Sequence, residues 1–385
     1  MQLIEQVASD ENIEQAFSWL CLKRKEHCHN NDVWNLRRHW QTIKPELQQQ
    51  LLDGTYQFSP QQEIRFDTET IELWASLDAL VLKAVTLVVT QYLKPHISNQ
   101  CVHVKGNGGG KEAVRQITRK LKDNSFVFRS DVKSYYASID HHVLMEQLHS
   151  YINDARVITL IYDYLNRTVQ FGGLYRDIKR GISLGCPLSP LIGALYLKLM
   201  DDRMEKTGLF YVRFMDDWIV LSPNRWKLKK AIQIVNQTLN ELKVEKHPDK
   251  TFIGRIAKGF DFLGYSFEPK GLSIAPKTLA NFLERKTQLY EQGATVRGIG
   301  QYVRNWYRWV IAGVDNLHIV PSIRHIILGL YISPRHVDLR STHQPSEGVW
   351  LDLWGCGPRT PMWHGKSMHG VKINITDHEW CLYVL

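Results

Sequence analysis

Two adjacent aspartates between two β-rich runs constrain this chain more than any other feature. Asp216 and Asp217 follow the run 209–212 and precede the run 218–221, so the pattern predicts a β-hairpin with both carboxylates at its turn. Adjacent carboxylates between apolar strands are costly unless a cation binds them. Hard cations such as Mg²⁺ prefer carboxylate oxygens. Taken alone, the segment 214–217 fits either an exposed turn or a metal site.

A third carboxylate, far away in the sequence, favours the metal site. The aromatic strand expected at 126–130 runs directly into Asp131, and Tyr136 follows five positions later. Two metal ions that clamp both oxygens of a phosphoryl transfer lie about 3.5–4 Å apart, so their ligands must come from neighbouring strands. Asp131 and Asp216 are 85 positions apart (216 − 131) and fit this demand. The sequence therefore predicts a two-metal site for phosphoryl transfer.

The order and spacing of five motifs resemble those of the reverse transcriptases, in particular the bacterial lineage that includes group II intron enzymes. The motifs are Asp131 with Tyr136, the segment 181–191 (GISLGCPLSPL), the segment 214–217 (FMDD), the segment 247–251 (HPDKT) and the segment 262–265 (FLGY). With their surroundings they cover roughly residues 60–315. The resemblance implies an α+β, right-hand polymerase fold with fingers, an antiparallel-sheet palm and a helical thumb.

The resemblance also implies a role for individual residues. Three carboxylates and one backbone carbonyl are the expected ligands of two Mg²⁺ ions, which Mn²⁺ can replace: Asp131, Asp216, Asp217 and the carbonyl of Val132. Tyr136 is expected to exclude a ribose 2′-hydroxyl and so to select deoxynucleotides. Gly185 and Ser189 are expected to face the template and the incoming nucleotide. Leu184 departs from the family, which usually has Gln there, and this departure bears on template choice or fidelity.

Three lysines are candidates for contact with the substrate. Lys105 and Lys111 bracket a glycine-rich loop ahead of an expected helix, where backbone N–H groups can hold phosphate. Because Glu112 follows Lys111, the loop is not a Walker loop, and a plain flexible loop is the alternative. Lys250 is either a solvated lysine or the cation that the chemistry needs near the leaving pyrophosphate. Arg65 matches the triphosphate ligand of the fingers only loosely.

The sequence divides into five expected regions. They are an N-terminal helical region at 1–55, the fingers at 56–125, the catalytic palm at 126–270, a helical thumb at 271–315, and a C-terminal extension of unknown role at 316–385. In the thumb, Arg304 and Arg308 share one helical face and suit the phosphates of a duplex. Tyr302, Trp306 and Trp309 share another face, which fits either the core or stacking on bases.

The composition agrees with a nucleic-acid partner. A formal net charge of +9 favours a polyanion. The expected partners are an RNA template, a DNA or RNA primer and dNTPs, with a dedicated non-coding RNA or an accessory protein as a further possibility. The six cysteines form no Cys-x-x-Cys pair, which indicates a reduced, cytoplasmic protein. The apolar run 80–89 contains Lys83 and is too short for a bilayer, so we expect no membrane contact.

The host role is inferred by elimination. We find neither the Val-Thr-Gly of retron thumbs nor the Ser-Gln that diversity-generating enzymes have at Ser189-Pro190, and no maturase, DNA-binding or endonuclease motif. Analogy then favours a stand-alone, domesticated reverse transcriptase that acts in antiphage defence. The alternatives are a catalytically idle scaffold for a structured RNA, a retron-like or diversity-generating enzyme, and RNA-templated RNA synthesis. The intact aspartates argue against the scaffold, and Tyr136 argues against RNA synthesis.

Overall fold

The computed structural model describes residues 2–65, 70–269, 271–312 and 317–318. Contacts within the chain define two compact units. The described part of the first unit runs to Ala280 and includes 311–312 and 317–318, and that of the second unit is Asn281–Val310. Apart from Leu317 and His318, the expected C-terminal extension lies outside the described residues.

The first part of the chain is helical. Its helices are α1 (Leu3–Val7), α2 (Asp10–Lys23), α3 (Asp32–Arg38) and α4 (Trp40–Asp53). The side chains of Ser9 and Asn31 accept backbone N–H groups at the starts of α2 and α3, which fixes where these helices begin. Helices α1, α2 and α3 contact α5 (Ser76–Leu93), which is apolar on nearly every side and forms the centre of this core.

Helix α5 and the 3₁₀ turn after it carry a longer apolar stretch than the run 80–89 suggested. In the described part of the chain, Ser76–His96 is the one helix that is long and apolar enough to cross a membrane by length and composition. Of its most apolar window, 67% is buried inside the fold. This is the burial that a core helix of a folded domain shows.

The central sheet of the first unit contains the expected catalytic segments. Its strands lie in the order β6-β7-β3-β8, and all neighbours are antiparallel. The strands are β3 (Phe126–Ser130), β6 (Phe210–Phe214), β7 (Asp217–Ser222) and β8 (Phe252–Arg255). Strand β3 therefore lies between the strand that begins at Asp217 and the strand that begins two residues after Lys250.

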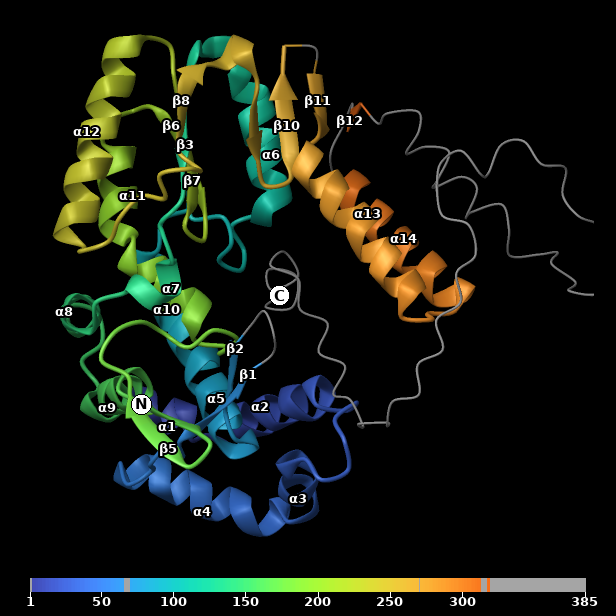
Figure 1. Ribbon diagram of the computed structural model, residues 1–385. Helices are drawn as coiled ribbons and strands as arrows, with labels where there is room; N and C mark the ends of the chain where they lie inside the picture. Colours follow the sequence, from blue (N-terminus) through green and yellow to red (C-terminus); the bar gives the residue numbers. More distant parts are fainter. Residues whose placement is uncertain (1, 66–69, 270, 313–316, 319–385) are drawn as a thin grey trace, which may run out of the picture. The chain divides into compact units, whose positions relative to one another are not determined.

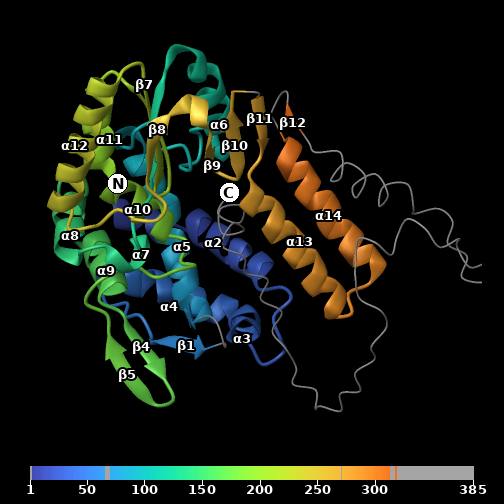
Figure 2. The same ribbon diagram turned by 45° about the horizontal axis from the view of Figure 1, so that its top comes forward.

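Helices cover both faces of this sheet (Figures 1 and 2). Helices α11 (Lys198–Glu205) and α12 (Arg225–Glu241) lie on one face and α6 (Gly109–Lys120) lies on the other. The other helices of this part of the chain are α7 (Tyr135–Ser138), α8 (His141–His149), α9 (Ala155–Leu165) and α10 (Ser189–Tyr196). Phe128 and Val220 pack in one core with α12, whereas Val127 and Leu221 pack in another with α6. Because both faces are buried, the interior of β7 (218–221) is a continuous apolar run rather than an alternating one.

A second sheet joins segments that are far apart in the sequence. Its order is β2-β1-β4-β5, and its strands are β1 (Gln61–Arg65), β2 (Thr70–Leu73), β4 (Thr168–Phe171) and β5 (Leu174–Asp177). β1 pairs in parallel with β4, with Gln61 opposite Val169. The hairpin β4–β5 comes from the range expected for the palm but shares its sheet with strands of the expected fingers. A boundary at residue 125 therefore does not separate the two sheets.

A third sheet and two helices complete the described chain. The sheet has the order β12-β11-β10-β9, with β9 (Phe260–Phe262), β10 (Tyr265–Glu268), β11 (Gly271–Ile274) and β12 (Leu317–His318). The helices are α13 (Pro276–Glu291) and α14 (Val296–Ile311). In the second unit, Phe282 stacks on Trp306 and on Tyr302, with ring centroids 4.0 and 5.7 Å apart. Tyr302 and Trp306 thus pack against Phe282, so the ring faces that contact Phe282 are not open for stacking on bases.

Candidate active site

The turn between β6 and β7 presents the two adjacent aspartates. Phe214 pairs with Asp217, which leaves Met215 and Asp216 as the two turn residues. Met215 has φ of 56°, a left-handed conformation that a side chain with Cβ rarely adopts. The hairpin that the sequence predicted is confirmed, and its strained turn residue is one position before Asp216. A strained conformation of this kind persists only when neighbouring groups hold the residue in it.

Strand pairing brings Asp131 to this turn. Ser130 at the end of β3 lies opposite Trp218 at the start of β7, so Asp131 and the aspartates of the turn meet at one end of the sheet. Burial, together with the charges of Asp216 and Asp131, raises the pKa of Asp217 to about 7. Burial also raises the pKa of Asp216 to about 6, and again Asp131 contributes. Three carboxylates therefore share one site in which their negative charges repel one another.

Lys250 partly neutralises this site. Its Nζ donates to Oδ2 of Asp131 over 2.6 Å, and this hydrogen bond is the main reason why the pKa of Lys250 is raised. The other oxygen of the buried Asp131, Oδ1, has no hydrogen-bond partner among the described residues. An oxygen left in this state is an open coordination position.

The donor set fits Mg²⁺. Within the described ranges, no group of three or more His, Cys, Asp and Glu side chains is arranged to hold a metal ion by itself. Mg²⁺ is commonly held by one or two carboxylates, with waters and substrate phosphates completing its shell, so a complete protein cage is not required. The open oxygen of Asp131 and the mutually repelling Asp216 and Asp217 meet that need. Val132 is buried and forms an isolated bridge with Lys246, which fixes the backbone next to Asp131.

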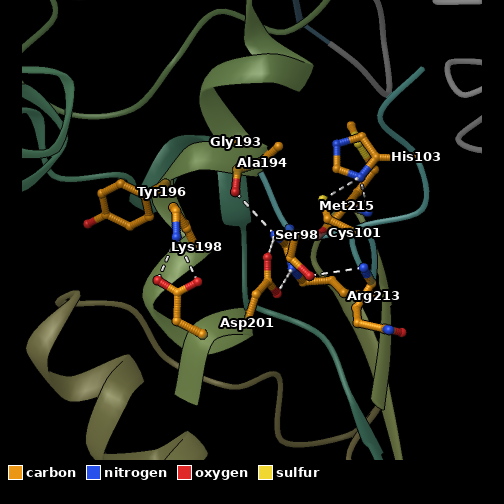
Figure 3. A network of polar contacts seen from close by, with 12 residues as sticks. Ser98, Cys101, His103, Gly193, Ala194, Tyr196, Lys198, Asp201, Arg213 and Met215 are labelled. Carbon is orange, nitrogen blue, oxygen red and sulfur yellow. Dashed lines mark hydrogen bonds and ion pairs between the residues drawn. The ribbon is translucent and has the colours of Figure 1, made fainter. Parts of the chain in front are cut away.

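A buried ion pair holds one side of the catalytic turn (Figure 3). Arg213 is fully buried and binds Asp201 of α11 through Nε and Nη2, over 2.8 and 2.5 Å. Its Nη1 donates to the carbonyl oxygen of Met215 over 2.6 Å, and Nη2 donates to that of Ala194 over 3.1 Å. The guanidinium therefore ties the turn to helices α10 and α11.

A partly buried histidine holds the other side of the turn. The N–H of Met215 donates to Nδ1 of His103 over 2.9 Å, and Nε2 lies 3.2 Å from the carbonyl oxygen of Pro190 (Figure 3). Because a backbone N–H only donates and a carbonyl only accepts, Nδ1 is the bare nitrogen and Nε2 carries the proton. Burial lowers the pKa of His103 to about 3, so the ring is neutral. Sequence reasoning missed His103, Arg213 and Asp201, although a charged residue inside the apolar strand 210–214 was a usable signal.

Tyr136 is joined to the glycine-rich turn. Its ring is partly buried against Tyr135, with centroids 5.8 Å apart, and its carbonyl accepts the N–H of Ile182 over 2.8 Å. Gly181 has φ of 85°, and a Cβ there would lie 2.9 Å from both the Tyr136 carbonyl oxygen and Cα of Ala137. Only glycine fits this contact without displacement of the backbone. The turn is therefore bonded to the backbone of Tyr136, the residue whose ring is expected to select the sugar.

The structure changes the interpretation of Ser189. Its side chain is fully buried, donates to the carbonyl oxygen of Ser183 and lies 2.8 Å from the hydroxyl of Tyr164. The hydroxyl of Ser189 thus holds the turn, and the expected contact of this residue with template or nucleotide stays a prediction. Gly185 has φ of 77° and is exposed, and the neighbouring Leu184 is 53% exposed at the tip. The tip of the turn is thus apolar where the family usually has an amide.

The remaining candidates have the following places. Lys111 donates to the hydroxyl of Tyr265 and lies over that ring, and burial lowers its pKa to about 8. Lys105 is exposed in the glycine-rich loop. In the second unit, Arg304 donates to Gln301 over 3.0 Å and Arg308 is exposed. Contacts of these four cations with phosphate stay predictions.

Comparison with known proteins agrees with this geometry. Residues 73–267, just over half of the 385 residues, match the family model described as reverse transcriptase (RNA-dependent DNA polymerase). Protein YkfC of Escherichia coli K12 is 22% identical over 57% of this chain and 69% of its own length. The group II intron-encoded protein LtrA of Lactococcus lactis is 22% identical over 51% of this chain and 34% of its own length.

A solved structure is also similar, at a low level. A chain of a partial Cas6-RT-Cas1–Cas2 complex matches 63% of this chain and 42% of its own length, with 21% identity and a TM-score of 0.40. The present chain thus spans between about a third and two thirds of the relatives named here. Given the matched residues and the paired strands that carry the three aspartates, this chain belongs to the reverse transcriptase family.

Proposed function

We propose that this chain is an RNA-directed DNA polymerase that adds dNTPs to the 3′-hydroxyl of a primer. The observation that carries the proposal is the pairing of β3 with β7, which brings Asp131 beside Asp216 and Asp217. Carboxylates from separate strands are what a two-metal phosphoryl transfer requires. The family match supports the same chemistry.

The residues of the site divide the chemical tasks. Asp131 and Asp216, with the Val132 carbonyl and support from Asp217, would hold two Mg²⁺ ions, or Mn²⁺ in their place. When bound, the ions activate the primer hydroxyl and stabilise the leaving pyrophosphate. The ammonium of Lys250 neutralises Asp131 in the free enzyme. When metal ions bind the carboxylates, this ammonium would be released to form an ion pair with the leaving pyrophosphate. The ring of Tyr136 excludes a ribose 2′-hydroxyl.

Primer extension on a defined RNA template tests the proposal. Purified protein is given a DNA primer annealed to RNA, labelled dNTPs and Mg²⁺, beside the Asp216→Ala/Asp217→Ala variant. We expect extension products that disappear with EDTA, with template RNase treatment and in the variant. Products that persist after RNase treatment would overturn templating by RNA. Tight RNA binding without any synthesis would favour the idle scaffold.

The proposed partners and host role go further than the family. RNA template, primer and dNTPs follow from the chemistry, and a dedicated RNA or an accessory protein is a further proposal. Sequencing of the nucleic acid that copurifies from the native host identifies that RNA. A role in antiphage defence rests on the sequence analogy. Plaque counts on cells with the wild type or with Asp216→Ala/Asp217→Ala test it, and equal counts would contradict it.

A further inference from the structure

A basic cluster lies at the end of the central sheet opposite to the catalytic carboxylates. Helix α12 begins with four exposed cations, Arg225, Lys227, Lys229 and Lys230. Trp226, in their midst, is 78% exposed. An exposed tryptophan is unusual on a helix whose apolar face is already buried in the core.

Two other segments bring further cations to the same place. The N–H of Ser125 donates to the carbonyl oxygen of Ser222, and the N–H of Ile256 donates to that of Ser125, both over 3.0 Å. These bonds hold the segments 120–125 and 255–258 beside the start of α12, as Figure 1 shows for the upper end of the sheet. They add four exposed cations: Lys120, Lys122, Arg255 and Lys258. We call these eight cations and Trp226 the basic edge.

The basic edge holds most of the excess charge of the protein. Its three segments (120–125, 223–230 and 255–258) contain eight cations and one carboxylate, Asp123, which gives a net charge of +7 (8 − 1). The whole chain carries +9, so all other residues together carry +2 (9 − 7). Within the described residues none of the eight cations forms an ion pair. Concentrated charge without internal partners indicates an anionic ligand rather than a solvated helix.

The single exposed aromatic ring distinguishes between anionic ligands. Membrane-surface helices bury a broad apolar face in the lipid, but Leu228, Ala231 and Val235 of α12 are already buried in the protein core. One indole surrounded by cations is instead the arrangement that binds a single strand, with the phosphates on the cations and a base on the ring. The geometry of the edge therefore favours nucleic acid with unpaired bases.

We propose that the basic edge is a second nucleic-acid site, which binds single-stranded RNA outside the primer–template site. The length of β3 separates it from Asp131, and five strand residues span about 17 Å. A strand bound there lies beyond the reach of the catalytic turn. The edge therefore anchors RNA and does not take part in synthesis, and its binding can be measured whether or not the chain polymerises.

Binding of a labelled oligouridylate RNA to full-length protein tests the proposal. The primer–template site is first saturated with a short unlabelled RNA–DNA duplex, and no dNTPs are added. The variant Lys229→Gln/Lys230→Gln lowers the net charge by two at the basic edge. The control Gln233→Glu/Asn240→Asp also lowers it by two, at exposed positions further along the same helix.

We expect the lysine variant to bind oligouridylate about tenfold more weakly than wild type at moderate salt, with a log–log salt slope smaller by about 1.4. The control should bind within about twofold of wild type, because only bulk charge has changed. Trp226→Ala should weaken binding by about tenfold, and Trp226→Phe should retain it. Extension of a short primer–template should be equal in all of these proteins.

Three results would overturn the proposal. Equal losses of oligouridylate binding in the lysine variant and in the control would show that only the net charge of the protein matters. If Trp226→Ala bound RNA as tightly as wild type, no base would stack on the Trp226 ring. Flotation of the wild type with phosphatidylserine vesicles, lost in the lysine variant while RNA binding is unchanged, would assign the edge to a membrane surface. Loss of primer extension in wild type would contradict the proposed polymerase and leave the RNA-binding result intact.

Discussion

The N–H of Met215 donates to Nδ1 of His103, a residue 112 positions earlier in the chain. The carbonyl of the same Met215 accepts from Arg213. Both polar groups of one left-handed residue are therefore held by side chains, and Asp216 follows it directly. The position of Asp216 thus depends on a neutral imidazole and a buried ion pair that bind the backbone of the residue before it.

Replacement of His103 should slow the chemistry without changing nucleotide affinity. In His103→Ala the N–H of Met215 loses its acceptor, which costs ~1–3 kcal/mol and lowers kcat about tenfold or more if the turn relaxes. In His103→Asn the amide oxygen can occupy the place of Nδ1, so most of the activity should return. Single-turnover dNTP incorporation separates kcat from KM. An equal fall in both variants would contradict the role of the hydrogen bond.

Acid should destabilise the protein partly through His103. Its pKa falls from 6.5 in the unfolded chain to about 3 in the fold, so between these values the unfolded chain binds the extra proton. Stability from this group is complete above pH 6.5 and is lost as the pH falls towards 3. Urea unfolding should show a slope steeper by up to about 1.4 kcal/mol per pH unit in wild type than in His103→Asn. Parallel slopes would mean that the pKa of His103 is the same in the folded and unfolded chain, which would contradict this prediction.

Tyr136 should select the sugar by its ring rather than by its hydroxyl. Tyr136→Ala should admit ribonucleotides, whereas Tyr136→Phe keeps the ring and should discriminate like the wild type. The ratio of kcat/KM for dNTP over rNTP in single-nucleotide extension measures this. A ratio that is unchanged in Tyr136→Ala would place the selection elsewhere.

Lys250 should compete with the metal ion for Asp131. Its Nζ lies 2.6 Å from Oδ2 of the same carboxylate whose other oxygen, Oδ1, is open to a metal, so the ammonium and the metal ion share one negative charge. Lys250→Met should therefore lower the Tm of the metal-free protein and enlarge the rise in Tm on addition of Mg²⁺. At the same time primer extension should fall, because the cation near the pyrophosphate is gone. An identical Mg²⁺ response in both proteins would exclude the competition.

Gly181→Ala should disrupt the contact between the glycine-rich turn and Tyr136. The added Cβ would meet backbone atoms at 2.9 Å, and the positive φ adds strain, so we expect a loss of about 3 kcal/mol in unfolding free energy. Gly208→Ala is the control, because Gly208 has φ of 66° and open space around it. It should lose about 1 kcal/mol from strain alone. If chemical denaturation showed equal losses of unfolding free energy in Gly181→Ala and Gly208→Ala, the backbone around residue 181 would have moved to relieve the clash.

Local turn chemistry predicted the hairpin, because it acts over a few residues. The convergence of its aspartates with Asp131 was predicted instead from the need of two-metal chemistry for carboxylates on neighbouring strands. Side-chain partners across the fold were beyond such patterns. His103 accepts the N–H of Met215, and the hydroxyl of Ser189 bonds to Tyr164 and to the carbonyl oxygen of Ser183. These contacts form only when the helices pack. The hairpin β4–β5 was placed with the palm by sequence order, yet hydrogen bonding places it beside β1.

The parallel pairing of β1 with β4 bears on how the chain matures during synthesis. Gln61 of β1 pairs with Val169 of β4, which is synthesised 108 positions later (169 − 61), so β1 lacks this neighbour until then. At ribosomal rates this delay is about 5–20 s, during which one edge of β1 is open to wrong pairing. The first sheet to be made is therefore completed only after β3 and helices α6 to α9 have been synthesised. We therefore expect the fingers and palm predicted from the sequence to fold together, and a nascent chain cut between them to expose the unfinished strand edge to aggregation.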